Sequence, residues 1–236
     1  MDYDNFNKLS FATCYLLFYF KSFQENITSL LGNIPMAKYS ARAGFINLQE
    51  EDVITAIENI YEKECKFELD HTLLRGAAES TQKRNASEIL KRLRKAPRSI
   101  WEEIPGLPSK ERRIALYYLI LKTHSFFFDF HMEVLLQKWR MMDRSFSKKD
   151  VLRFIEKNMD DHPEMENWSE ESKGRISRTV KLLLDQIDLI DENQELQTVN
   201  VAGSLWELFI REGEAWFLEA MLLNKQERKR YSSTIT

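Results

Sequence analysis

Glycine and proline are too scarce in this chain to build a fold with many tight turns. The sequence of 236 residues contains 7 glycines and 5 prolines. All-β and dinucleotide-binding folds need many turns at which these residues supply special backbone angles. From Gln49 onward, apolar residues instead recur at the three- and four-residue spacing of amphipathic helices. The sequence therefore predicts an all-α, compact globular protein of many helices, long enough to bury a substantial core.

The most apolar stretch lies in the middle of the chain. After a break at "IPGLPS", residues 104–109, the sequence continues as "RIALYYLILKTHSFFFDFHMEVLLQKWRMM". This pattern predicts two helices, at 110–122 and 125–142, that are apolar nearly all round. Helices of this kind are buried, so we expect the pair to form the centre of the core.

Two further helices concentrate positive charge, although the whole chain has a formal net charge of -3. The helix predicted at 170–187 begins after a good capping residue, Ser169, and carries an apolar stripe. Its cations are Lys173, Arg175, Arg178 and Lys181, the last three opposite the stripe. The helix predicted at 80–95 repeats this design. Its cations on the far side from the stripe are Lys83, Arg84, Lys91, Arg92 and Lys95.

Charge is segregated between neighbouring helices. The predicted helix at 49–64 holds six acidic residues and one basic residue, whereas residues 75–98 hold eight basic and two acidic ones. A cationic helix face attracts the phosphates of a nucleic acid whatever the base sequence, so we interpret these nine cations as candidate DNA contacts. The alternative interpretation is that both faces are simply solvated.

Each basic helix follows a shorter helix and a connector, which is the order of a helix-turn-helix unit used twice. The short polar stretch "DENQELQTVNV", residues 191–201, has some strand character and could form a small wing. The expected organisation is an N-terminal extension (1–37), a first helix-turn-helix region (38–104), a central helix pair (105–146), a second helix-turn-helix region with the wing (147–201), a C-terminal helical pair (202–224) and a flexible tail (225–236).

Signatures of catalysis, metal binding and membrane insertion are missing from the sequence. It contains no phosphate-binding glycine loop or nucleophile elbow, and its four histidines have no metal-site spacing, so we predict neither enzyme, cofactor nor metal. Cys14 and Cys65 stand alone, which indicates a reducing cytoplasm. The longest apolar run, "LSFATCYLLFYF" at residues 9–20, is too short to span a bilayer.

The order of these segments resembles the BrxA family of bacteriophage exclusion (BREX) defence proteins. The resemblance covers about residues 38–224 and is carried by "STQKRNASEILKRLRK", "FFFDFHMEVLLQKW" and "HPEMENWSEESKGRISRTVKLLLDQIDLI". It implies an all-helical protein with two helix-turn-helix elements that binds double-stranded DNA without catalysing a reaction. It also implies partners from the same system: a DNA methyltransferase, an ATPase and a phosphatase-like protein. On this chain the two elements would end in helices 80–95 and 170–187.

Two other functions fit the same charges. The chain, which we expect to be a monomer, could be a scaffold whose basic faces dock on the methyltransferase or the ATPase, or it could be an RNA-binding helical module. Steep salt dependence would separate DNA binding from the scaffold, because DNA binding releases counterions. Competition between duplex DNA and RNA hairpins would separate the two nucleic acids.

Residues 1–35 lie upstream of the resemblance and have a less regular apolar stripe than the later helices. One explanation is an additional helix that covers apolar surface on the core. The other is that translation begins at Met36, the first internal methionine. We favour the second explanation, because the capping residues and apolar stripes typical of the later helices become less regular where the resemblance stops.

Overall fold

The structure, a computed structural model, describes residues 38–62 and 67–233. Contacts divide the chain into residues 1–37 and residues 38–236. The expectations for the N-terminal extension lie outside the described residues. Among the described residues every regular element is helical and none is a strand, which confirms the all-α prediction.

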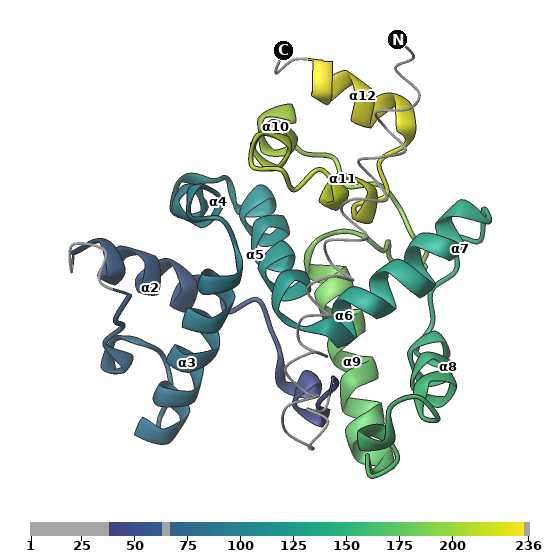
Figure 1. Cartoon of the computed structure of the whole chain (residues 1–236), viewed down its shortest axis with the longest axis horizontal. Coiled ribbons are helices and arrows are strands. Elements are labelled where there is room, and N and C mark those ends of the chain that lie inside the picture. Colours follow the sequence, from purple (N-terminus) through teal and green to yellow (C-terminus); the bar gives the residue numbers. More distant parts are fainter. Residues whose placement is uncertain (1–37, 63–66, 234–236) are drawn as a thin grey trace, which may run out of the picture. The chain divides into compact units, whose positions relative to one another are not determined.

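The helices follow one another along the chain from η1 to α12 (Figure 1). Before the central helices come η1 (Ala41–Phe45), α2 (Glu50–Glu62), η2 (His71–Leu73), α3 (Glu79–Lys95), α4 (Arg98–Glu103) and η3 (Ile104–Gly106). The central helices are α5 (Ser109–Thr123), α6 (Ser125–Phe130), η4 (His131–Leu135) and α7 (Leu136–Arg140). The remaining helices are α8 (Lys148–Asn158), η5 (Pro163–Met165), α9 (Glu170–Gln186), α10 (Gly203–Arg211), α11 (Trp216–Ala220) and α12 (Lys225–Ser233).

Helix α5 forms the centre of the core. All of its residues from Ile114 to Leu121 are buried, so no face of this part of the helix is solvated. Helix α3 packs against α5, as does α6, which follows it in the chain. Phe126, Phe127 and Phe130 of α6 are buried as well. The burial of these residues confirms the prediction of a central apolar helix pair.

The second central helix contains a π turn. It runs as α6, then the π-helical turn η4, then α7. This turn begins at His131, whose side chain is fully buried. The hydroxyl of Tyr117 donates to Nδ1 at 2.9 Å, and Nε2 lies 2.6 Å from the backbone oxygen of Ala220. Because that carbonyl can only accept, Nε2 carries the proton. Burial disfavours the charged form, so the imidazole is neutral and its Nδ1 is the acceptor. The π turn therefore begins at a histidine whose hydrogen bonds join the central helix pair to α11.

His131 should make the stability of the fold depend on pH. Burial lowers the pKa of His131 to about 4, although the hydrogen bond to Ala220 opposes this shift. The unfolded chain, with a histidine pKa near 6.5, then binds more protons than the folded chain below that pH. Stability is therefore fully present above pH ~6.5 and should fall by about 3 kcal/mol as pH drops to ~4.

Urea denaturation at a series of pH values measures this effect. The variant His131→Gln removes the titrating group, so its stability curve should be flatter over the same range than that of the wild type. Equal pH dependence in the two proteins would contradict the role of His131.

The last part of the chain differs from expectation. Residues 225–236, expected to be a flexible tail, are helical as far as Ser233 because α12 has its own cap. The Asn224 side chain accepts from the N–H groups of Gln226 and Glu227, and Glu227 accepts from the Asn224 N–H at 2.7 Å. The ring of Tyr231 also packs so closely on Gly203 that a Cβ there would lie 2.9 Å from it. Nearer the N-terminus, the short helix α4 was not predicted from the sequence either.

The segment expected to form a wing is an irregular turn rather than a pair of strands. Isolated bridges pair Ile190 with Leu196 and Ser145 with Glu195. The Asp191 carboxylate holds the turn by accepting from the N–H groups of Asn193 and Glu195. Carboxylate–backbone bonds of this kind stabilise a turn without requiring a strand.

Candidate nucleic-acid interface

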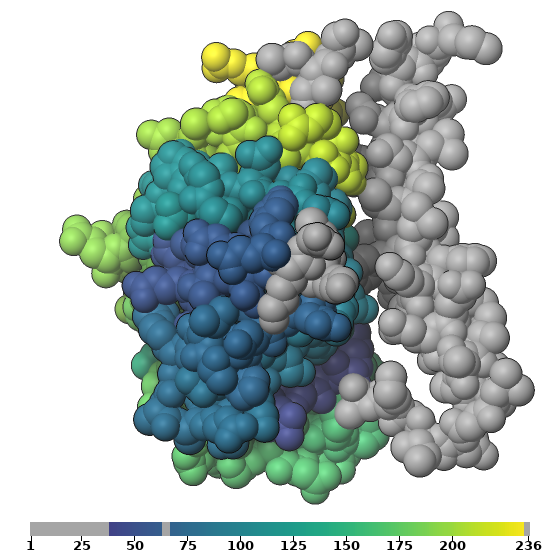
Figure 2. Space-filling view, turned by 90° about the vertical axis from the view of Figure 1, so that its left-hand side faces the viewer, coloured from purple at the N-terminus to yellow at the C-terminus, as the bar shows by residue number. Residues whose placement is uncertain are grey.

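Helix α3 buries one face and exposes the opposite one. Ala86, Ile89 and Leu93 are buried, as their spacing predicts. In the space-filling view, α2 and α3 together cover much of one face of the molecule (Figure 2). The outward side of α3 is therefore available to a partner.

Three cations stand on the outward side of α3 without a compensating carboxylate. Arg84, Lys91 and Lys95 are exposed and form no ion pair with any residue that the structure describes. Their spacing of seven and four residues places them within roughly 40° of one another on the helix, centred opposite the apolar stripe. They form a line about 16 Å long. We call these three residues the α3 line.

The two other predicted cations of α3 are engaged. Lys83 forms an ion pair of 2.6 Å with Glu79, four residues earlier. Arg92 is only 1% exposed, which overturns its assignment as a DNA contact. Its position lies about 100° from the centre of the apolar stripe, at the flank of the stripe rather than opposite it. A guanidinium at the flank can turn inward, and this one does.

Arg92 is the centre of a buried polar network. Its Nε donates to Glu88 at 2.8 Å and its Nη1 donates to the backbone oxygen of Asn47 at 2.8 Å. Nε2 of His124, at the end of α5, lies 2.6 Å from the same Glu88 carboxylate. Burial alone would raise the pKa of Glu88, but the hydrogen bonds and charges of His124 and Arg92 outweigh burial and lower it to about 2. The network fastens α3 to α5 and to the segment before α2.

The cations predicted on α9 are largely compensated. Ser169 caps the helix as predicted, by accepting from the N–H of Ser172. Three of the four cations form ion pairs within the helix: Lys173 with Glu170 at 2.8 Å, Arg175 with Glu171, and Lys181 with Asp185 at 2.6 Å. Of the four, only Arg178 is exposed, and the other three are half-buried. The Nε of Arg178 donates to the backbone oxygen of Gly174.

Arg175 packs against η1 instead of pointing away from the protein. Its guanidinium lies 4.4 Å from the ring centre of Phe45, and its stem passes over Gly44. The expectation that Arg175, Arg178 and Lys181 share a fully solvated face is therefore correct only for Arg178. The short helix η1, which was not predicted from the sequence, covers this part of α9.

Helix α8 carries a second row of exposed cations that the sequence analysis did not select. Lys149, Arg153 and Lys157 are spaced four residues apart and are all exposed. Arg153 is 75% exposed and its guanidinium is 4.0 Å from Asp150, the limit of an ion pair. The same helical-wheel argument that found α3 would have found this row, because Val151, Phe154 and Ile155 form the buried stripe of α8.

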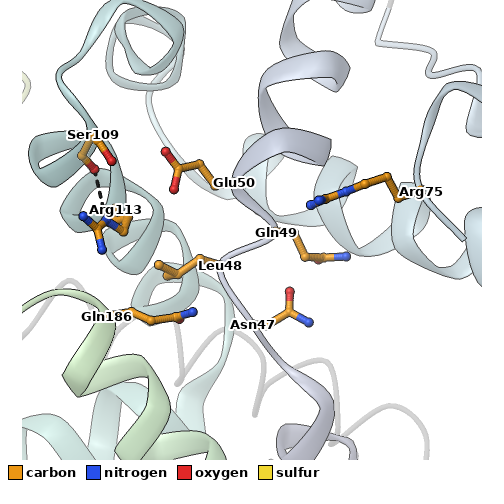
Figure 3. A pocket seen from close by; sticks show the side chains of 8 residues that line it. All are labelled: Asn47, Leu48, Gln49, Glu50, Arg75, Ser109, Arg113 and Gln186. Carbon is orange, nitrogen blue, oxygen red and sulfur yellow. Dashed lines mark hydrogen bonds between the residues drawn. The ribbon is translucent and has the colours of Figure 1, made fainter.

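A polar pocket of about 570 Å³ lies near the start of α2 (Figure 3). It is lined by Asn47, Leu48, Gln49, Glu50, Arg75, Ser109, Arg113 and Gln186. Arg75 pairs with Glu51 at 2.6 Å, and Glu50 pairs with Arg112 at 3.2 Å. The remaining cation, Arg113, donates from Nε to the backbone oxygen of Ser109. Each charged side chain that lines this pocket thus has a partner within the protein.

The described ranges, 38–62 and 67–233, contain neither a candidate metal site nor a helix suited to a membrane. No three histidine, cysteine, aspartate or glutamate side chains in these ranges converge on a point where a metal could bind. None of the helices in these ranges has the length and apolar character needed to cross a bilayer.

These features define an all-helical protein with rows of exposed cations on α3 and α8. A family model described as BrxA matches residues 38–213, and the chain belongs to that family. It is therefore a BREX phage-defence protein. The chain is also similar to the crystal structure of an uncharacterized protein from Magnetospirillum magneticum, with 17% identity and a TM-score of 0.63. That similarity covers 78% of this chain and 98% of the other, and it shows a shared fold. No curated protein matches the sequence.

Proposed function

We propose that this protein is a non-catalytic component of its BREX system that binds double-stranded DNA. The observation that carries the proposal is the α3 line: Arg84, Lys91 and Lys95 are exposed, aligned and without carboxylate partners among the described residues. An exposed row of cations without carboxylate partners contributes little to the stability of the fold. It can, however, neutralise DNA phosphates and release their counterions. At about 16 Å, the line is long enough to follow several successive phosphates of one strand.

The row of exposed cations on α8 provides further candidate phosphate contacts in the second half of the chain. In the proposed arrangement, α2 with α3 and α8 with α9 are the two helix-turn-helix units. The described residues that precede the second helix of each unit, 67–78 and 159–169, already outnumber the three- or four-residue turn of the simplest units. The phosphate contacts would come from α3 and α8, with Arg178 added from α9.

The ion-paired cations play a secondary role in the proposal. Lys83, Lys173, Arg175 and Lys181 each have an acidic partner on the same helix. An exposed ion pair contributes only ~0–1 kcal/mol, so a phosphate can replace the carboxylate at small cost. Arg92 is excluded, because its guanidinium is committed to Glu88 and Asn47 inside the fold.

Membership of the system also suggests partners among its other proteins, for which the family resemblance names a methyltransferase, an ATPase and a phosphatase-like protein. We further propose that the chain acts as a monomer in the cytoplasm, where the DNA of an invading phage would meet it.

A competition experiment tests the proposed ligand. The full chain is bound to a fluorescent random-sequence duplex, and unlabelled duplex DNA or an RNA hairpin with the same number of phosphates is added. We expect the duplex DNA to displace the probe at a concentration at least tenfold lower than the hairpin, an order of magnitude that charge alone would not give. More effective displacement by the hairpin would favour an RNA-binding module. Failure to bind the duplex at all would favour the protein scaffold.

A further inference from the structure

We propose that η1 and α9 together form a minor-groove contact in which Phe45 is the inserting side chain. The contact consists of Arg42 and Phe45 on η1 and of Arg175 and Arg178 on α9, and we call it the η1–α9 patch. The inference rests on the proposed function, because it describes how one part of the surface would engage the duplex.

Phe45 is a large apolar side chain that the fold leaves in water. It is 62% exposed, while Ala43 and Gly44 beside it are buried. Residues three apart lie one above the other in a 3-10 helix, so the exposed Arg42 shares the face of Phe45. The patch thus combines an apolar tip with a cation on the same short helix.

The backbone of η1 is fixed to α9 directly beneath Phe45. The Thr179 hydroxyl donates to the backbone oxygen of Gly44 at 2.8 Å, and Thr179 is buried. A Cβ at Gly44 would lie 3.0 Å from Cγ of Arg175, so the absence of a side chain at Gly44 lets the two elements approach this closely. The N-terminal end of η1 is capped by Ser40, whose hydroxyl accepts from the N–H of Arg42. The backbone that carries Phe45 is therefore held in a fixed position against α9.

The guanidinium of Arg175 completes the patch on the α9 side. It lies 4.4 Å from the centre of the Phe45 ring, and Glu171 holds it from the preceding turn. Arg178, three residues further along α9, is exposed and shares this side of the helix. The two elements of the patch thus carry three arginines and one acidic residue, with Arg175 in direct contact with the aromatic ring.

This combination of chemistry fits the minor groove better than the major groove. The major groove is usually read by a long helix or a β-ribbon, whereas η1 has only five residues. Minor-groove proteins combine arginines with an apolar side chain that wedges between base steps. The positive surroundings of Phe45 would attract the phosphates on either side of the groove, so the apolar tip and the cations favour the same ligand.

The test compares duplexes in which inosine replaces guanine. This replacement removes the exocyclic amino group from the minor groove and leaves the major-groove edge unchanged. We expect the wild-type chain to bind the inosine duplex several-fold more tightly than the guanine duplex. Phe45→Ala should lower affinity for the guanine duplex by on the order of tenfold, remove the preference for inosine and leave the salt slope unchanged.

Met141→Ala is the matched control, because Met141 is 79% exposed at the end of α7, away from η1 (Figure 1). It should behave like the wild type, and circular dichroism should show that both variants are folded. Equal affinity of the wild type for both duplexes, or an unchanged inosine preference in Phe45→Ala, would overturn the inference while leaving DNA binding intact. Absence of DNA binding by the wild type would instead reject the proposed function.

Discussion

Replacing Arg84, Lys91 and Lys95 together with alanine is expected to weaken binding to duplex DNA by roughly 500-fold at 0.1 M salt. Each phosphate contact contributes about 0.9 to the slope of log affinity against log salt, so three contacts contribute about 2.7. Between 1 M and 0.1 M salt, a slope of this size raises the affinity for DNA by a factor of about 10 to the power 2.7, and the variant should lose this factor. The three side chains are exposed and make no ion pair with the described residues, so the fold should hardly change.

A polarisation titration of the wild type and the variant measures this loss. The matched control replaces Lys225, Lys229 and Arg230 of α12 with alanine, which removes the same charge from a helix distant from α3 in Figure 1. It should lose far less affinity than the α3 variant. Equal losses in the two variants would mean that net charge, and not the α3 line, governs binding.

Replacing Arg92 with alanine is expected to destabilise the fold by about 3–5 kcal/mol without a specific effect on DNA contacts. The change removes one partner of a buried ion pair and leaves the Glu88 carboxylate with His124 alone. It also leaves the backbone oxygen of Asn47 without its donor, Nη1 of Arg92. Since a domain is stable by only about 5–15 kcal/mol, the loss should be obvious in urea denaturation at neutral pH.

A double variant separates this mechanism from a simple loss of packing. Glu88→Gln with Arg92→Met removes both charges, keeps an acceptor for His124 and approximately preserves volume, so it should recover most of the lost stability. Arg92→Ala with a cost below about 1 kcal/mol would show that the pair is not fixed. Arg92 would then return to the group of candidate DNA contacts.

Periodicity alone sufficed to predict most of the fold. The apolar spacing located α3, α5 and α9, and the capping residue Ser169 marked where α9 begins. Helices α4 and α12 were not predictable from the sequence, for local reasons. A six-residue helix is too short to show a period, and the cap at Asn224 lies in a segment that has few apolar residues.

The candidate interface was less predictable because charge type does not determine the direction of a side chain. The positions of Arg84, Lys91 and Lys95 follow from the helical wheel, since they lie opposite the stripe. The burial of Arg92 depends on acceptors at Glu88 and Asn47, the second of which is 45 residues away in the sequence. The contact of Arg175 with Phe45 likewise joins segments far apart in the chain. Contacts of this kind arise only when the chain folds.

The most direct test of the central claim is the salt dependence of duplex DNA binding by the full wild-type chain. Affinity for a random-sequence duplex would be measured by polarisation at a series of salt concentrations between about 0.05 and 0.3 M. The account predicts a straight line of log affinity against log salt with a slope of about −2.7 or steeper, since the α3 line alone supplies three phosphate contacts. A slope near zero, or no binding at the lowest salt concentration, would contradict it.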